Sequence, residues 1–187
     1  MSTAEPEAAE PEAVGPEAVG PEAVGPEAVP EEAPGRYLPV IDAMIALPFP
    51  AADFADAAGY GGPDFRVRVL RASEDFWDDE YHRALNLADA QMSAVLGTLA
   101  AALTVRWGDP LTVDLGPYLE VGFDGEWVPE PVGSLSQCAC SMQVWTVPDR
   151  GRWIGLTVGQ HDTELPLELM AVVARTPLPA PGAGVAG

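Results

Sequence analysis

The chain has 187 residues, with 29 Asp and Glu against nine Arg and no Lys, and its formal net charge is −20. A negative field of this size repels phosphate backbones and anionic lipid surfaces, so we expect no nucleic-acid binding and no membrane docking. Hydrophobic residues make up 48% of the chain, which is enough to bury a single core, and we expect one domain with tails.

Residues 1–35 form a low-complexity segment. The unit Pro-Glu-Ala-Val-Gly repeats between Pro11 and Pro30, and the segment holds nine Glu and no cation. One Val per unit cannot offset the entropy of ordering the backbone, so the composition predicts a disordered acidic arm. Such an arm could act as a spacer or a decoy anion, although replication slippage alone also leaves repeats of this kind. Residues 177–187 are rich in Pro, Gly and Ala and are predicted to be a flexible tail.

The predicted domain spans residues 36–176 and keeps a net charge of −11, since 20 acidic residues and the nine Arg lie outside the arm. Phe65–Arg71 alternates apolar and Arg residues, which predicts a strand with one solvated face. Ser73 is a suitable N-cap and is followed by several acids, which favour a helix start. An apolar stripe at helical spacing predicts that this helix ends near Trp107. The stripe is Trp77, Tyr81, Leu85, Ala88, Met92, Val95, Leu96, Leu99 and Leu103.

The sequence after this helix has the features of strands. Leu119–Val128 is predicted to be a hairpin around Asp124-Gly125. Gln137–Val147 and Arg152–Gln160 are predicted to be the main hairpin, and Leu165–Ala174 a further strand. We therefore expect an α+β fold, in which one long amphipathic helix packs across an antiparallel sheet of about four to six strands.

The expected register of the main hairpin pairs Pro148 with Arg152 across a three-residue loop. This register places Val144 and Leu156 on an apolar inner face, together with two buried, unreactive thiols, Cys138 and Cys140. It places Trp145, Trp153 and His161 on the opposite face. We interpret the two tryptophans as solvent-exposed anchors for a partner, with a second interpretation in which residues 41–58 or a loop cover that face.

The sequence offers few candidates for chemistry. Cys138, Cys140, His161 and Asp162 lack the spacing of a zinc site, and we predict no metal there. Asp78, Asp79 and His82 begin the predicted helix, but one carboxylate and one imidazole on a face are too few to hold a cation. No nucleophile elbow and no phosphate-binding loop occur, so we predict no catalytic residues and no cofactor.

The apolar segment 90–105 is shorter than a membrane-spanning helix, and residues 1–10 lack the pattern of a signal peptide. Two cysteines that alternate on a strand do not pair with each other. These features predict a reduced, cytoplasmic protein.

The leading hypothesis is a non-enzymatic, acidic interaction domain that binds a basic or hydrophobic protein surface, on another protein or on a second copy in a homodimer. Its candidate contact residues are Trp145, Trp153, Asp78, Asp79 and His161. In architecture and charge the chain resembles toxin-neutralising immunity proteins and small acidic secretion chaperones, by analogy alone. The alternative is a small-molecule-binding protein or enzyme with a pocket between helix and sheet, using His161, Asp162 and Glu164 as polar groups.

Overall fold

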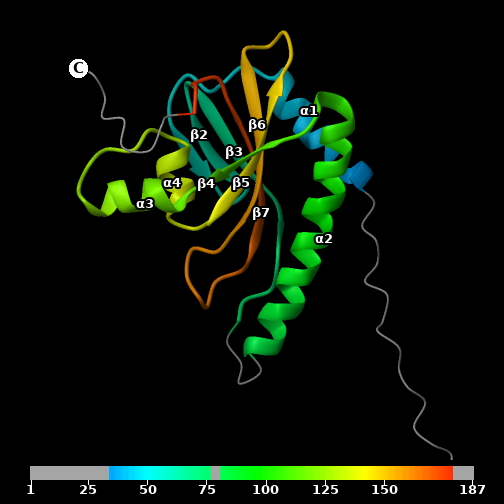
Figure 1. Ribbon diagram of the computed structural model, residues 1–187, viewed down its shortest axis with the longest axis vertical. Helices are drawn as coiled ribbons and strands as arrows, with labels where there is room; N and C mark the ends of the chain where they lie inside the picture. Colours follow the sequence, from blue (N-terminus) through cyan, green and yellow to red (C-terminus); the bar gives the residue numbers. More distant parts are fainter. Residues whose placement is uncertain (1–33, 77–80, 179–187) are drawn as a thin grey trace, which may run out of the picture. The chain divides into compact units, whose positions relative to one another are not determined.

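The computed structural model describes residues 34–76 and 81–178, which form an α+β fold (Figure 1). Its sheet has seven antiparallel strands in the order β1-β2-β3-β7-β6-β5-β4. The strands are β1 (Phe54–Asp56), β2 (Gly59–Gly62), β3 (Phe65–Ala72), β4 (Leu111–Asp114), β5 (Ser141–Val147), β6 (Arg152–Gly159) and β7 (Glu168–Ala174). The helices are η1 (Pro34–Arg36), α1 (Leu38–Ala46), α2 (Tyr81–Trp107), α3 (Gly116–Phe123) and α4 (Val132–Ser136).

The long helix on an antiparallel sheet is confirmed, and the sheet has one strand more than the upper end of the expected range. The predicted arm lies outside the described residues, except that Pro34 and Gly35 begin η1. Residues 179–187 of the predicted tail also lie outside them.

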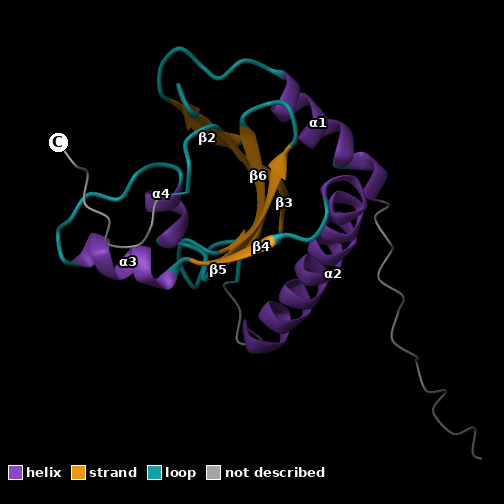
Figure 2. Ribbon diagram, turned by 45° about the horizontal axis from the view of Figure 1, so that its top comes forward, coloured by secondary structure: helices purple, strands orange, loops and turns teal. Residues whose placement is uncertain are grey.

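Helices cover both faces of the sheet, as Figure 2 shows, with α1 and α2 on one side and α3 and α4 on the other. Each face therefore has its own apolar core. The core under α1 and α2 is formed by residues that include Ile41, Leu99, Leu103, Trp145, Ile154, Leu156 and Val173. The core under α3 and α4 includes Val67, Leu115, Tyr118, Leu135, Met142, Val144, Trp153 and Val172.

The hairpin of β5 and β6 lies where it was predicted, but its register differs by one residue. Val147 pairs with Arg152 and Trp145 with Ile154, so four residues, Pro148 to Gly151, make the connection. Because side chains alternate between faces, this shift moves Trp145 under α2 and leaves Trp153 on the other face. The predicted register assumed a single buried face. With both faces covered, apolar residues on opposite sides carry no exposure penalty.

The helix α2 is anchored by the predicted stripe. Met92, Val95, Leu99 and Leu103 are all buried against the sheet. The helix ends at Trp107, where Gly108 has a positive φ of 85° and its N–H bonds to the carbonyl of Thr104. By length and composition alone, the segment His82–Trp107 is long and apolar enough to cross a membrane. The apolar part of this helix is therefore longer than residues 90–105, on which the prediction that it is too short for a membrane span was based.

The predicted cap of this helix is wrong. Ser73 continues the pairing of the sheet beyond β3, because its N–H bonds to the Leu167 carbonyl and its hydroxyl accepts a hydrogen bond from the Leu167 N–H. Residues 77–80 lie outside the described part of the chain, and the first described residue of α2 is Tyr81.

The hairpin predicted over Leu119–Val128 is also wrong, because the first half of this segment belongs to α3 and the rest is a loop. Gly125, which has a φ of 81°, follows the helix end instead of forming a hairpin turn. A residue with positive φ suits both structures, and only the burial of Leu115 and Tyr118 under the sheet selects the helix. Similarly, Gln137–Cys140 follow α4, and β5 begins only at Ser141.

Candidate functional site

The tryptophans predicted to be exposed are both buried. The Trp145 side chain is 1% exposed in the core under α1 and α2, and Trp153 is 8% exposed in the opposite core. The second interpretation was right for Trp145, because Ile41 and Met44 of α1 belong to the same core. Neither indole is therefore available on the described surface as an anchor for a partner.

The other predicted contact residues are scattered or lie outside the structure. His161, Asp162 and Glu164 are exposed in the loop between β6 and β7, and none of them lines the two grooves or the pocket described below. Asp78 and Asp79 lie outside the described residues. Sequence reasoning therefore did not identify a set of residues that the fold brings together.

The two thiols are free and differ in environment. Cys138 is half-buried beside the Leu135 carbonyl, and burial, with a smaller contribution from Glu168, raises its pKa to about 11. Cys140 is exposed, so the expectation that both thiols are buried is wrong for this residue. In the described ranges, no three His, Cys, Asp or Glu side chains lie together where they could hold a metal ion.

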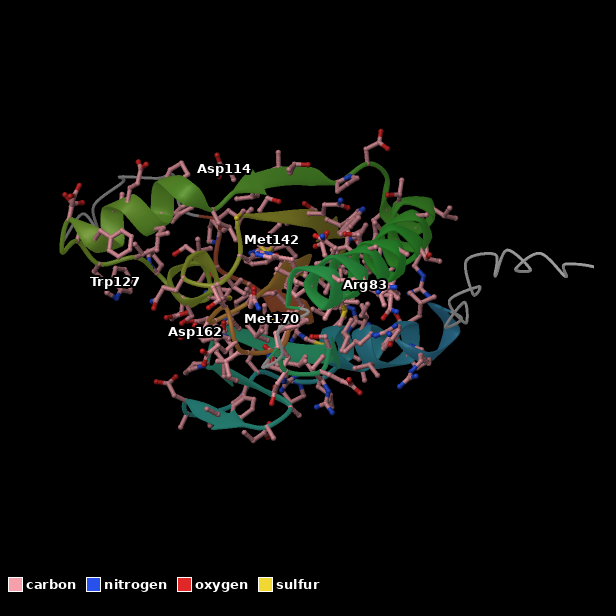
Figure 3. The ribbon with its side chains drawn as sticks, turned by 90° about the horizontal axis from the view of Figure 1, so that it is seen from below. Arg83, Asp114, Trp127, Met142, Asp162 and Met170 are labelled. Atoms are coloured by element: carbon pink, nitrogen blue, oxygen red, sulfur yellow. The ribbon has the colours of Figure 1, made fainter. Side chains whose placement is uncertain are left out.

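The structure instead has a groove between α3, α4 and the loop that joins them, with a volume of about 600 Å³. We call it the α3–α4 groove. Its lining consists of Tyr118, Leu119, Gly122, Phe123, Glu126, Trp127, Val128, Glu130, Gly133, Ser136 and Gln137. Phe123 is 80% exposed and Trp127 is 67% exposed. Figure 3 shows Trp127 in the loop after α3, on the other side of the domain from Arg83 of α2.

The α3–α4 groove is strongly acidic. The chain has no Arg, Lys or His between Trp107 and Asp149, whereas Glu126 and Glu130 line the groove, and Glu120 and Asp124 belong to α3 and its C-cap. Phe123, the last residue of α3, lines the groove, so the carbonyl end of this helix adds partial negative charge nearby. Glu130 is held in place by the Ser134 hydroxyl, which donates to its carboxylate at 2.7 Å. The groove thus combines aromatic surface with unneutralised carboxylates.

The hydroxyl and the aromatic rings of this lining have distinct surroundings. The Ser136 hydroxyl is buried and donates to the Gly133 carbonyl at 2.9 Å, and no His lies among the lining residues. The hydrogen bond of this hydroxyl is therefore made to a backbone carbonyl and not to a side-chain base. Exposed aromatic rings beside a groove of this size are typical of sites that bind another molecule.

The sequence prediction missed this groove for a specific reason. A hairpin over 119–128 would put Phe123 and Trp127 on a small ribbon, whereas the observed helix and loop place them beside α4. The signal that could have found the site is the stretch from Trp107 to Asp149, which holds seven acids and no cation.

A second pocket, of about 450 Å³, lies between α2 and the ends of β5 and β6. Its polar lining includes Asp89, Ser93, Cys140, Gln143 and Gln160. It therefore occupies the place between helix and sheet that the alternative hypothesis requires, with different polar residues from those expected. Comparison of the chain with protein-family models, with curated proteins and with solved structures gives no match.

Proposed function

We propose that the protein is a non-enzymatic, cytoplasmic interaction domain whose α3–α4 groove binds a basic, amphipathic segment of a partner protein. The observation that carries the proposal is the pair of mostly exposed aromatic side chains, Phe123 and Trp127, beside a groove that holds carboxylates and no cation. A basic partner is what the charge of the whole chain predicts. The contact residues proposed here, however, differ from those predicted from the sequence.

The aromatic side chains would supply most of the affinity. Removing a large apolar side chain from water contributes about 1.5–3 kcal/mol, and Trp is enriched among the residues that dominate binding energy. A partner with Leu or Phe side chains can fill the groove and cover both rings. Phe123 and Trp127 have no role in either core that would explain their identity.

The carboxylates would select a cationic partner. Glu126 and Glu130 line the groove, and an Arg or Lys placed between them can also stack on the indole of Trp127. The surrounding negative field would accelerate the encounter, and salt would screen this effect. Binding should therefore weaken as ionic strength rises, whereas its aromatic component should remain.

A matched set of peptides tests this proposal with the full-length protein. We expect a labelled peptide that combines Arg with Leu to bind, measured by fluorescence anisotropy. The analogues with Glu in place of Arg, or with Ser in place of Leu, should bind much more weakly. Trp127→Ala should lower the affinity at least about tenfold, because hot-spot truncations cost about 2 kcal/mol or more.

Control variants separate the groove from general attraction to an acidic protein. Leu111→Ala removes another exposed apolar side chain, 62% exposed on β4, and should leave the affinity unchanged. Glu126→Gln should weaken binding more than Asp149→Asn, which removes the same charge from the exposed β5–β6 turn. If Trp127→Ala and Leu111→Ala bind the peptide equally, the groove is not the binding site and the proposal is wrong.

The pocket under α2 favours a second candidate function, binding of a small molecule between helix and sheet. Its volume lies within the range of ligand sites, and its amide and hydroxyl groups could orient a polar ligand. A metabolite that fills this pocket is expected to shield Cys140 from a thiol reagent. Shielding of Cys140 without any effect of Trp127→Ala would favour this second function.

A further inference from the structure

Three arginines gather on the α1 side of the sheet without a carboxylate among them. Arg66 of β3 pairs with Val173, which pairs with Ile154 of β6, and Arg152 lies two residues from Ile154 on the same strand. In the described part of the chain, neither Arg66, Arg68 nor Arg152 forms an ion pair with an acid. This is unusual in a chain with 29 acidic residues, where partners for cations are abundant.

Arg152 has a structural role that explains its position. Its Nη1 donates to the carbonyls of Ile45 and Leu47 at 2.6 and 2.8 Å, and its guanidinium stacks on Phe49 at 4.4 Å from the ring centre. These bonds satisfy carbonyls at the C-terminal end of α1, where a cation is favoured. The positive charge of Arg152 is therefore fixed beside Arg66.

Arg66 and Arg68 have hydrogen-bonding capacity that the fold does not use. Arg66 Nη2 donates to the Pro48 carbonyl at 2.9 Å, but its Nη1 is buried and has no partner within the described residues. Burial, followed by the nearby charges of Arg152 and Arg68, lowers the pKa of Arg66. Arg68 is exposed two residues away on the same face. Placing the positive charges of these arginines close together without an acid is unfavourable. A bound carboxylate would neutralise them, and guanidinium groups are well suited to binding carboxylates.

A groove of about 460 Å³ adjoins these two arginines. We call it the α1–β3 groove. It is lined by Pro39, Val40, Ala43, Met44, Leu47, Arg66 and Arg68. At 1.5 Å per residue, its apolar strip extends about 12 Å along α1. The strip has no charged side chain, so the groove is cationic at one side and apolar along its length.

We propose that the α1–β3 groove binds a medium-chain aliphatic carboxylate, with the carboxylate on Arg66 and Arg68 and the alkyl chain along α1. The charge of the arginines is complementary to the head group, and the apolar strip is complementary to the tail. Arg66 and Arg68 are separated by about 7 Å along one strand, a spacing that lets a single head group contact both. The α1–β3 groove lies on the opposite face of the sheet from the α3–α4 groove, so this proposal is independent of peptide binding.

Titration of the full-length protein with sodium octanoate, followed by calorimetry and by saturation-transfer NMR, tests this site. We expect saturable binding of octanoate. Acetate, which lacks the tail, and 1-octanol, which lacks the charge, should bind much more weakly. Arg68→Gln should weaken octanoate binding about tenfold, the effect of losing one charge-assisted hydrogen bond. The Arg68 side chain forms no hydrogen bond in the described structure, so this variant should fold normally.

Two further variants make the result decisive. Arg150→Gln removes the same charge from the exposed β5–β6 turn and should leave octanoate binding unchanged. Ala43→Phe, at an exposed position on α1 that lines the groove, should block the tail and abolish binding. The proposal is overturned if octanoate does not bind saturably, if Arg68→Gln and Arg150→Gln bind it equally, or if Ala43→Phe binds it as tightly as the natural chain.

Discussion

At the scale of single residues, the two buried tryptophans differ in one hydrogen bond. Trp153 Nε1 donates to the Thr176 carbonyl at 2.7 Å, whereas Trp145 Nε1 is buried and has no partner within the described residues. A buried N–H without an acceptor costs about 1–3 kcal/mol, so these two indoles contribute differently to stability although both are almost fully enclosed.

We predict that Trp153→Phe destabilises the fold more than Trp145→Phe. Both changes remove similar volume, but only the first removes a hydrogen bond, and the second removes an unsatisfied group. The difference should be about 1 kcal/mol in the free energy of unfolding. Urea titration followed by far-UV circular dichroism measures it. Equal stability of the two variants would show that Trp145 Nε1 has a partner in solution.

We also predict that the two thiols react at different rates. Cys140 is exposed, whereas Cys138 is half-buried with a pKa of about 11, so little Cys138 thiolate exists near neutral pH. Cys140 should therefore be alkylated first at pH 8, and Cys138 should accelerate as the pH rises toward 11. Mass spectrometry of Cys138→Ser and Cys140→Ser separates the two rates. Equal rates at pH 8 would contradict the burial of Cys138.

At the scale of elements, α1 depends on contacts from outside the helix. It has only nine residues, and a helix of this length is marginal in isolation. Ile41 anchors it in the core, and Arg152 bonds to the carbonyls at its end. The ion pair between Arg106 of α2 and Asp42 is largely exposed and should contribute little.

Arg152→Gln should therefore destabilise the fold by about 2 kcal/mol, because it leaves the carbonyls at the end of α1 without their charged donor. Thermal unfolding measures this effect. Arg150→Gln, which is two residues away in the exposed turn, should change the free energy of unfolding by less than about 0.5 kcal/mol. Similar losses in both variants would mean that net charge, and not the contact with α1, accounts for the change.

At the scale of the whole domain, the sheet separates two surfaces of opposite character. On one side, α3 and α4 carry acids and exposed aromatic rings, and on the other side β3 and β6 bring arginines next to the end of α1. The net charge of −20 describes neither surface by itself. The proposed ligands follow these local charges, with a cationic segment on one side and a carboxylate on the other.

The sequence by itself determined the elements whose signal is local. The stripe of α2, its end at Gly108, the alternation of β3 and the turn after Val147 all depend on residues within a few positions of each other. The acidic character of the surface that includes Glu126 also follows from composition.

Only the tertiary structure decided which faces are covered. A strand pattern such as that of β6 does not show whether helices lie on one face or both, and this choice placed Trp145 and Trp153 in two separate cores. The segment around Asp124-Gly125 suits a hairpin as well as a helix end, and its packing on the sheet selected the helix. The α1–β3 groove brings α1 beside Arg66 and Arg68 of β3, about 20 residues further along the chain, and the α3–α4 groove, although lined by the single stretch 118–137, exists only because α3 and α4 pack on the sheet. Their positions therefore result from long-range packing, which no local pattern encodes.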